Sequence, residues 1–106
     1  MKPHRSRPYA GLTPDTVLDA LQHAGLRGDG RMLALNSYEN RVYQANLEDG
    51  TAVVAKFYRP HRWSDAQLAE EHAFALELEE REIPVVAPLR LGGNTLHRFA
   101  DFRFAI

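Results

Sequence analysis

The stretch that decides the fold is "VVAKFYRP", residues 53–60, in which one lysine stands inside an apolar run that ends at a proline. Valine, phenylalanine and tyrosine favour strands, and proline disfavours them, so we expect a β-strand that ends before Pro60. Because side chains alternate along a strand, Lys56 shares a face with Ala52 and Val54. A lysine in this position either extends its ammonium group to water near the strand end or meets an anion.

Two further strands are expected directly before this one. Met32–Leu35 and Val42–Leu47 are short apolar runs, and the polar stretch "NSYENR", residues 36–41, separates them. "EDG" at 48–50 is a strong turn sequence and leads straight into the lysine strand. Three consecutive strands joined in this way predict an antiparallel meander.

A helix is expected soon after the lysine strand. Ser64 and Gln67 form the pattern of a capping box, and Trp63 before the cap can pack onto Leu68. The pattern predicts a helix from Asp65 to about Arg81.

An earlier helix is expected near the N-terminus. Thr13 suits the N-cap, Pro14 suits the first helical position, and Gly25 suits the stop. Residues 1–11 before it are expected to form a flexible, partly basic tail. The folded domain is therefore expected to span residues 12–106.

The last quarter of the chain is expected to be mostly extended. The prolines of "IPVVAP", residues 83–88, exclude a helix there. Leu89–Leu91 and Phe102–Ile106 then suit two more strands, with a turn at residues 92–94. The order of elements predicts an α+β fold with a five-stranded antiparallel sheet.

Composition excludes several classes of protein. The chain has 106 residues, a formal net charge of −1 and no cysteine, which rules out a disulfide framework and gives no electrostatic footprint of nucleic-acid binding. The five histidines lack the spacing of metal ligands. No apolar stretch is long enough to span a membrane, so we expect a cytoplasmic protein with no membrane partner.

The second helix places Glu71 among its apolar residues. Leu68 lies three positions before Glu71, and Phe74 lies three after it. A carboxylate on the buried side of a helix needs a partner, and Lys56 is the nearest basic candidate on a facing strand. Glu70 competes for this role but has more polar helical neighbours. A structural ion pair that binds no ligand is the alternative interpretation.

The loop between the first two strands completes a recognisable arrangement. Ser37 and Asn40 allow backbone N–H groups and a hydroxyl to approach phosphate oxygens. A strand–loop–strand unit, a strand lysine and an inward helix glutamate are the parts of a protein-kinase-like N-terminal lobe with one C-type helix. In that lobe the lysine holds the α- and β-phosphates of ATP, and the glutamate holds the lysine.

Four stretches together resemble a known family. They are "TPDTVLDAL" (13–21), "LNSYENRVYQ" (35–44), "VVAKFYRPHRW" (53–63) and "EEHAFALELEEREIPVVAPL" (70–89). They resemble the N-terminal lobe of bacterial stress-response serine/threonine kinases, within the aminoglycoside phosphotransferase and choline kinase family. The resemblance implies a kinase-like lobe, with an extra N-terminal helix, over nearly all of residues 12–106.

The resemblance also implies an ATP site. Six residues match family positions: Ser37 and Asn40 in the phosphate loop, Val42 and Val54 against adenine, Lys56 at the phosphates, and Glu71 beside the lysine. Val54 stands where many protein kinases have alanine, and the loop lacks G-x-G-x-x-G, as is usual in this branch. The catalytic aspartate and the Mg²⁺ ligands of the family belong to a C-terminal lobe, so neither is expected among these residues.

We therefore expect ATP-dependent phosphoryl transfer to serine or threonine of a protein by a longer parent enzyme, and no activity from this chain alone. The alternatives are a small-molecule kinase of the aminoglycoside, choline or homoserine type, and a non-enzymatic α+β interaction domain. The chain ends abruptly on apolar residues and is expected to be truncated. An uncovered face around Phe102, Phe104 and Ile106 would then let the fragment self-associate.

Overall fold

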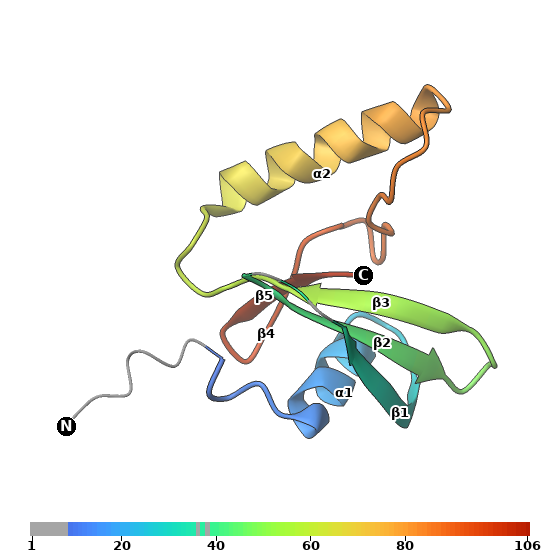
Figure 1. Ribbon diagram of the computed structural model, residues 1–106, viewed down its shortest axis with the longest axis vertical. Helices are drawn as coiled ribbons and strands as arrows, with labels where there is room; N and C mark the ends of the chain where they lie inside the picture. The colour runs from blue at the N-terminus through green and yellow to red at the C-terminus, as the bar shows by residue number, and fades with distance from the viewer. Residues whose placement is uncertain (1–8, 36, 38) are drawn as a thin grey trace.

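The computed structural model describes residues 9–35, 37 and 39–106, so most of the predicted basic tail and two loop residues, Asn36 and Tyr38, lie outside the described residues. Within them the chain forms an α+β fold, as predicted. Its elements are α1 (Pro14–His23), β1 (Gly28–Leu35), β2 (Arg41–Leu47), β3 (Ala52–Phe57), α2 (Asp65–Glu80), β4 (His97–Phe99) and β5 (Phe102–Ala105). The sheet lies in the middle, with α1 on one side and α2 on the other (Figure 1).

The strands form one antiparallel sheet in the order β1-β2-β3-β5-β4, which confirms the predicted meander of β1, β2 and β3. Val42 of β2 lies opposite Lys56 of β3, and Lys56 lies opposite Ala105 of β5. Directly opposite residues share a face, so these three side chains, together with Val54, lie on one face of the sheet. The lysine therefore has apolar neighbours on both sides, as predicted.

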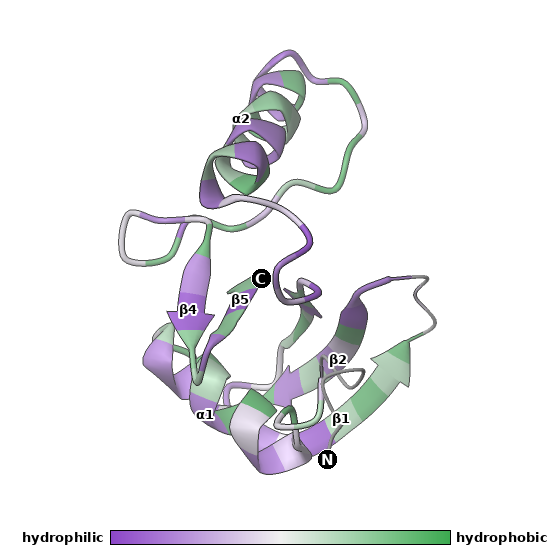
Figure 2. Cartoon of the chain, turned by 90° about the vertical axis from the view of Figure 1, so that its left-hand side faces the viewer, coloured by the Kyte–Doolittle hydropathy of each residue, from purple (hydrophilic) through white to green (hydrophobic). Residues whose placement is uncertain are grey.

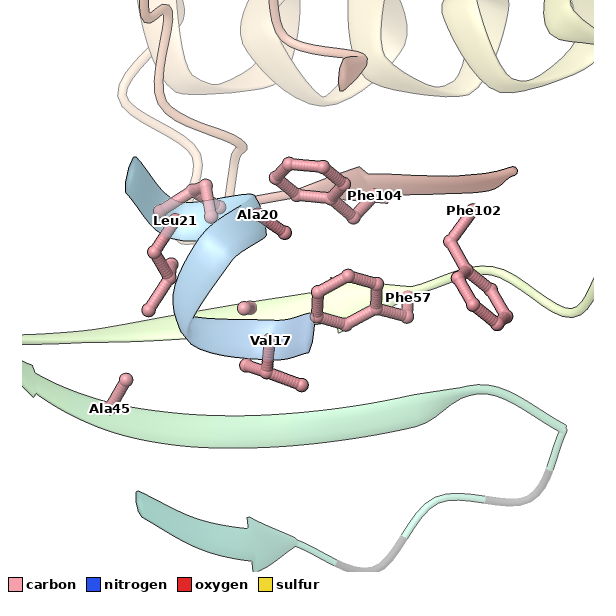
Figure 3. Close-up of a cluster of buried hydrophobic side chains, with 9 residues drawn as sticks. Val17, Ala20, Leu21, Ala45, Phe57, Phe102 and Phe104 are labelled. Carbon is pink, nitrogen blue, oxygen red and sulfur yellow. The ribbon is translucent and has the colours of Figure 1, made fainter. Parts of the chain in front are cut away.

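The core lies on the other face, under α1. Val17, Ala20 and Leu21 of α1 are fully buried and belong to one cluster with Phe57 and Phe104 (Figure 3). Burying each of the larger apolar side chains contributes about 1.5–3 kcal/mol. This packing orients the sheet so that its opposite face is left for α2 and for the candidate site.

Local sequence explains why α1 sits where it does. Thr13 caps the helix, since its side chain accepts a hydrogen bond from the backbone N–H of Thr16, and Gly25 follows the helix with φ of 97°. Gly28 allows close packing against the helix, because a Cβ at that position would lie 2.8 Å from Cδ2 of Leu18. The N-terminal helix was predicted correctly at both ends.

Helix α2 begins as predicted, but its inward side differs. Ser64 and Gln67 form the capping box, and Trp63 packs against the cluster that contains Leu68. The buried residues of α2 are Leu68 and His72, whereas Phe74 is 62% exposed, so the predicted inward position of Phe74 is wrong. Apolar and polar residues are spread around α2 (Figure 2), and no apolar stripe defines its rotation.

The predicted strand at Leu89–Leu91 is also wrong. Leu91 forms only an isolated bridge with Asn94, across glycines at positive φ, and the edge strand of the sheet is β4 instead. β4 and β5 are joined by Ala100 and Asp101, with φ of 51° and 70°. These are the angles of a two-residue hairpin turn that usually contains Asn-Gly, so the sequence lacked the usual turn residues.

The face expected to be uncovered is in fact buried. Phe102, Phe104 and Ile106 are 7%, 0% and 8% exposed, because all three belong to the core cluster that includes Val17, Ala20 and Leu21 of α1. The exposed large apolar side chains are instead Leu33, Val54, Phe74, Ile83, Val86 and Leu89. None of the helices in the described part of the chain has the length and apolar character to cross a membrane.

Candidate functional site

The sheet face that carries Lys56 forms one wall of a cavity of about 560 Å³, which we call the central cavity. Helix α2 and residues 86–89 form other parts of its lining. Leu89 is tied to the end of β5, since its backbone N–H donates to the carbonyl of Ile106 at 2.9 Å. The volume lies within the range of about 300–1,000 Å³ that is typical of small-molecule sites.

Lys56 is half-buried on this wall, between β2 and β5. Its Nζ lies 5.5 Å from the centre of the Tyr58 ring, an arrangement in which the ring face attracts the cation. Val42 and Val54 line the cavity with it. Among the described residues that line the cavity, Lys56 is the lysine or arginine that supplies a positive charge. The wall therefore combines an apolar surface with a single ammonium group.

Glu71 lines the same cavity, but it does not pair with Lys56 as the sequence led us to expect. Among the described residues no ion pair within 4.0 Å joins the two side chains, and Glu71 is exposed. The reason is the rotation of α2, which turns His72 rather than Glu71 toward the sheet. Both charged groups still face one cavity, so the role of Glu71 toward the lysine stays a prediction.

His72 holds α2 in this rotation through a buried hydrogen-bond network. Its Nε2 lies 2.6 Å from the Tyr58 hydroxyl, and its Nδ1 lies 2.8 Å from Oγ1 of Thr95. In either tautomer one ring nitrogen donates and the other accepts, so both nitrogens are satisfied. The network joins α2 to the residue that follows β3 and to the segment before β4.

Burial keeps this network uncharged. It lowers the pKa of His72, an effect that Glu71 partly opposes and Lys56 reinforces. Burial also raises the pKa of Tyr58 to about 12, and the negative charge of Glu71 adds to this effect. Two neutral groups with complementary hydrogen-bonding atoms are therefore the stable state at neutral pH.

The two predicted loop residues lie beside a second cavity of about 330 Å³, which Ser37 and Asn40 line together with Val42. The side-chain oxygen of Asn40 accepts a hydrogen bond from the backbone N–H of Arg59 at 3.3 Å. Asn40 thus ties the loop to the segment after β3. Val42 borders both cavities, so the loop and the lysine wall share one residue.

The structure thus brings four of the six predicted residues to the central cavity: Val42, Val54, Lys56 and Glu71. Ser37 and Asn40 are adjacent to it rather than on it. Tyr58 and His72 also line this cavity and were not predicted from the sequence. One indication was available, because His72 lies four positions after Leu68 on the same side of the helix.

The central cavity fits a nucleotide by chemistry and size. Its apolar wall at Val42 and Val54 suits a planar base, and the ammonium of Lys56 suits phosphate oxygens. Among the residues described, no three histidine, aspartate or glutamate side chains gather as metal ligands. The residues present therefore fit ATP, and they offer no resident site for its Mg²⁺.

Comparison with known proteins decides the family, since residues 31–106 match the phosphotransferase enzyme family. The chain belongs to this family. Over 98 residues, 92% of the chain, it is 53% identical to "Stress response kinase A" of Salmonella choleraesuis and 52% identical to the protein of that name in Escherichia coli K12. It is also 52% identical to "Serine/threonine protein kinase RdoA" of Salmonella typhimurium. The chain spans about 30% of the length of these relatives.

All six predicted site residues fall within the segment that matches the phosphotransferase enzyme family. Helix α1 and Tyr9 precede it. The N-terminal segment is thus an addition to the part of the fold that the family match covers.

Proposed function

We propose that this chain is the N-terminal, nucleotide-binding lobe of a cytoplasmic kinase that transfers the γ-phosphoryl group of ATP to serine or threonine of a protein. The observation that carries the proposal is Lys56, a half-buried cation on the apolar wall of the central cavity, within a segment that matches the phosphotransferase enzyme family. The name of one relative, "Serine/threonine protein kinase RdoA", favours a protein substrate. Because the chain spans about 30% of the length of these relatives, the proposal treats it as one lobe of a longer enzyme.

In this proposal the residues of the chain bind and orient ATP. Val42 and Val54 hold the adenine ring against the sheet, and the ammonium of Lys56 contacts the α- and β-phosphates. The loop at Ser37 covers the phosphates from the side of the second cavity. Glu71, across the same cavity, orients the lysine once nucleotide has drawn the two together.

ATP supplies the phosphoryl group, and Mg²⁺ neutralises charge on its phosphates. The base and the metal ligands are assigned to the C-terminal lobe, so the 106-residue chain alone should bind ATP at most weakly and transfer nothing. A small-molecule acceptor of the aminoglycoside, choline or homoserine type is the alternative, because the description of the matched family names no acceptor.

The test is Lys56→Met in the full-length enzyme, with transfer of labelled phosphate from ATP to a serine- and threonine-containing protein as the readout. We expect a fall of about 10²–10³-fold, since a preorganised charge at the phosphates is lost. Arg27→Met is the matched control, because it also removes a cation but from an exposed position. An unchanged rate for Lys56→Met, with retained folding, would overturn the proposal and favour an interaction domain in which Lys56 has only a structural role.

A further inference from the structure

We infer that Tyr9, which precedes the segment matching the family, is a positioning residue for the ATP site, because its hydroxyl ties the loop between β1 and β2 to the strand that carries Lys56. The inference rests on the proposed function. It assigns a task to the N-terminal segment, part of which the sequence analysis placed in a flexible tail.

One hydroxyl group bridges the two parts of the site that would contact phosphate. The Tyr9 hydroxyl lies 2.8 Å from the backbone carbonyl oxygen of Glu39 and 3.3 Å from that of Phe57, and it is the donor to both. Glu39 lies in the loop, two positions after Ser37, and Phe57 directly follows Lys56. Sharing one proton between these carbonyls holds the loop at a set distance from the lysine strand.

The ring of Tyr9 is fixed from two sides. It stacks on Phe102 of β5 with ring centres 6.3 Å apart and planes 5° apart, and the guanidinium of Arg41 lies 4.9 Å from its centre. Burial raises the pKa of Tyr9 to about 12, so the hydroxyl stays a donor at neutral pH. A ring held in this way cannot follow the loop outward without losing both contacts.

Two other contacts connect the same loop to the residues that follow β3. Arg62 Nε donates to Oε1 of Glu39 at 3.0 Å, and the backbone N–H of Arg59 donates to the Asn40 side chain at 3.3 Å. These two donors lie on an exposed connecting segment, whereas Phe57 belongs to β3 itself and is fully buried. Tyr9 therefore links the loop to the rigid part of the lysine strand.

This geometry predicts an effect on nucleotide affinity more than on chemistry. Without the hydroxyl, the loop keeps its sequence and its contacts with Arg59 and Arg62, but its distance from Lys56 is less constrained. ATP must then order the loop when it binds, which weakens binding. Groups that act on the transferring phosphoryl lie elsewhere, so turnover at saturating ATP should change little.

The experiment compares Tyr9→Phe with the wild-type full-length enzyme. We expect KM for ATP to rise about three- to tenfold, the effect of one net hydrogen bond, with kcat within about twofold. Hydrogen exchange at the amides of residues 39–41 should become faster in the same variant. Tyr43→Phe is the matched control, since Tyr43 packs against the α1 side of the sheet and its ring contacts Phe57.

Each result decides the inference. An unchanged KM for ATP in an active Tyr9→Phe enzyme would overturn the inference. A lower thermal midpoint with a lower kcat and no change in KM would also overturn it, because that result would indicate a merely structural role. If the wild-type enzyme shows no phosphoryl transfer, the proposed function fails by itself. In that case unchanged amide exchange in Tyr9→Phe would also overturn the link between the loop and β3, and faster exchange would support it.

Discussion

Replacing Tyr58 with phenylalanine is the sharpest test of what holds α2 over the sheet. The change removes only the hydroxyl that lies 2.6 Å from Nε2 of His72 and leaves the ring in the cluster with Leu68 and Ala105. Tyr58 and His72 are 3% and 4% exposed, so water cannot readily replace the lost partner. The variant therefore buries a ring nitrogen with nothing to bond to.

The expected loss of stability follows from that unsatisfied nitrogen. Leaving a buried polar group without a partner lowers the free energy of unfolding by about 1–3 kcal/mol. Because both groups are almost fully buried, we expect a value near the middle of this range, about 2 kcal/mol. The second bond of His72, to Thr95, remains and limits the loss.

Urea unfolding of the chain measures this value. With a slope of about 1–2 kcal/mol per M for a protein of this size, the midpoint should fall by about 1–2 M without a change in slope. Tyr43→Phe is the control, because it removes the same group from a half-buried ring on the other face. If the two variants agree within about 0.5 kcal/mol, the network does not hold α2 and our account of its rotation is wrong.

Two further predictions concern charge. Burial lowers the pKa of His72 and of His97, so the unfolded chain binds more protons than the folded chain below about pH 6.5. The free energy of unfolding should therefore be greatest above about pH 6.5, fall as the pH drops toward the lowered pKa values, and then level off. Urea titrations across this pH window would check the profile, and a flat profile would contradict it. Asp65→Asn should destabilise the chain by about 1 kcal/mol in the same assay, because the side chain of Arg103, only 11% exposed, loses its carboxylate partner at 3.0 Å. Asp29→Asn, at a surface pair, should change stability less than Asp65→Asn does, and equal effects would refute this ranking.

Several local features could be predicted because their causes lie within a few residues. The capping box of Ser64 and Gln67, the cap at Thr13 and the turn at residues 48–50 each depend on hydrogen bonds or dihedral angles between near neighbours. These local signals helped to predict the starts of both helices and the first three strands. The β4–β5 hairpin did not, since Ala100 and Asp101 adopt positive φ without the usual turn residues.

The candidate site was also only partly predictable from the sequence. Alternation along one strand was sufficient to place Lys56 beside Val54 on an apolar face, and the family resemblance then named the residues around it. The sequence could not show that Phe102 and Phe104 are covered, because the covering residues come from the N-terminal segment and α1, nearly the whole chain length away.

By itself, then, the sequence determined the two helices, the three-stranded meander and the apolar surroundings of Lys56, since each depends on near neighbours or on strand alternation. Only the tertiary structure decided which side of α2 faces the cavity. Apolar residues are spread around this helix, so its own pattern leaves the rotation open. Two hydrogen bonds from His72, to residues 14 positions before it and 23 after it, select the rotation and leave Glu71 at an exposed position on the cavity.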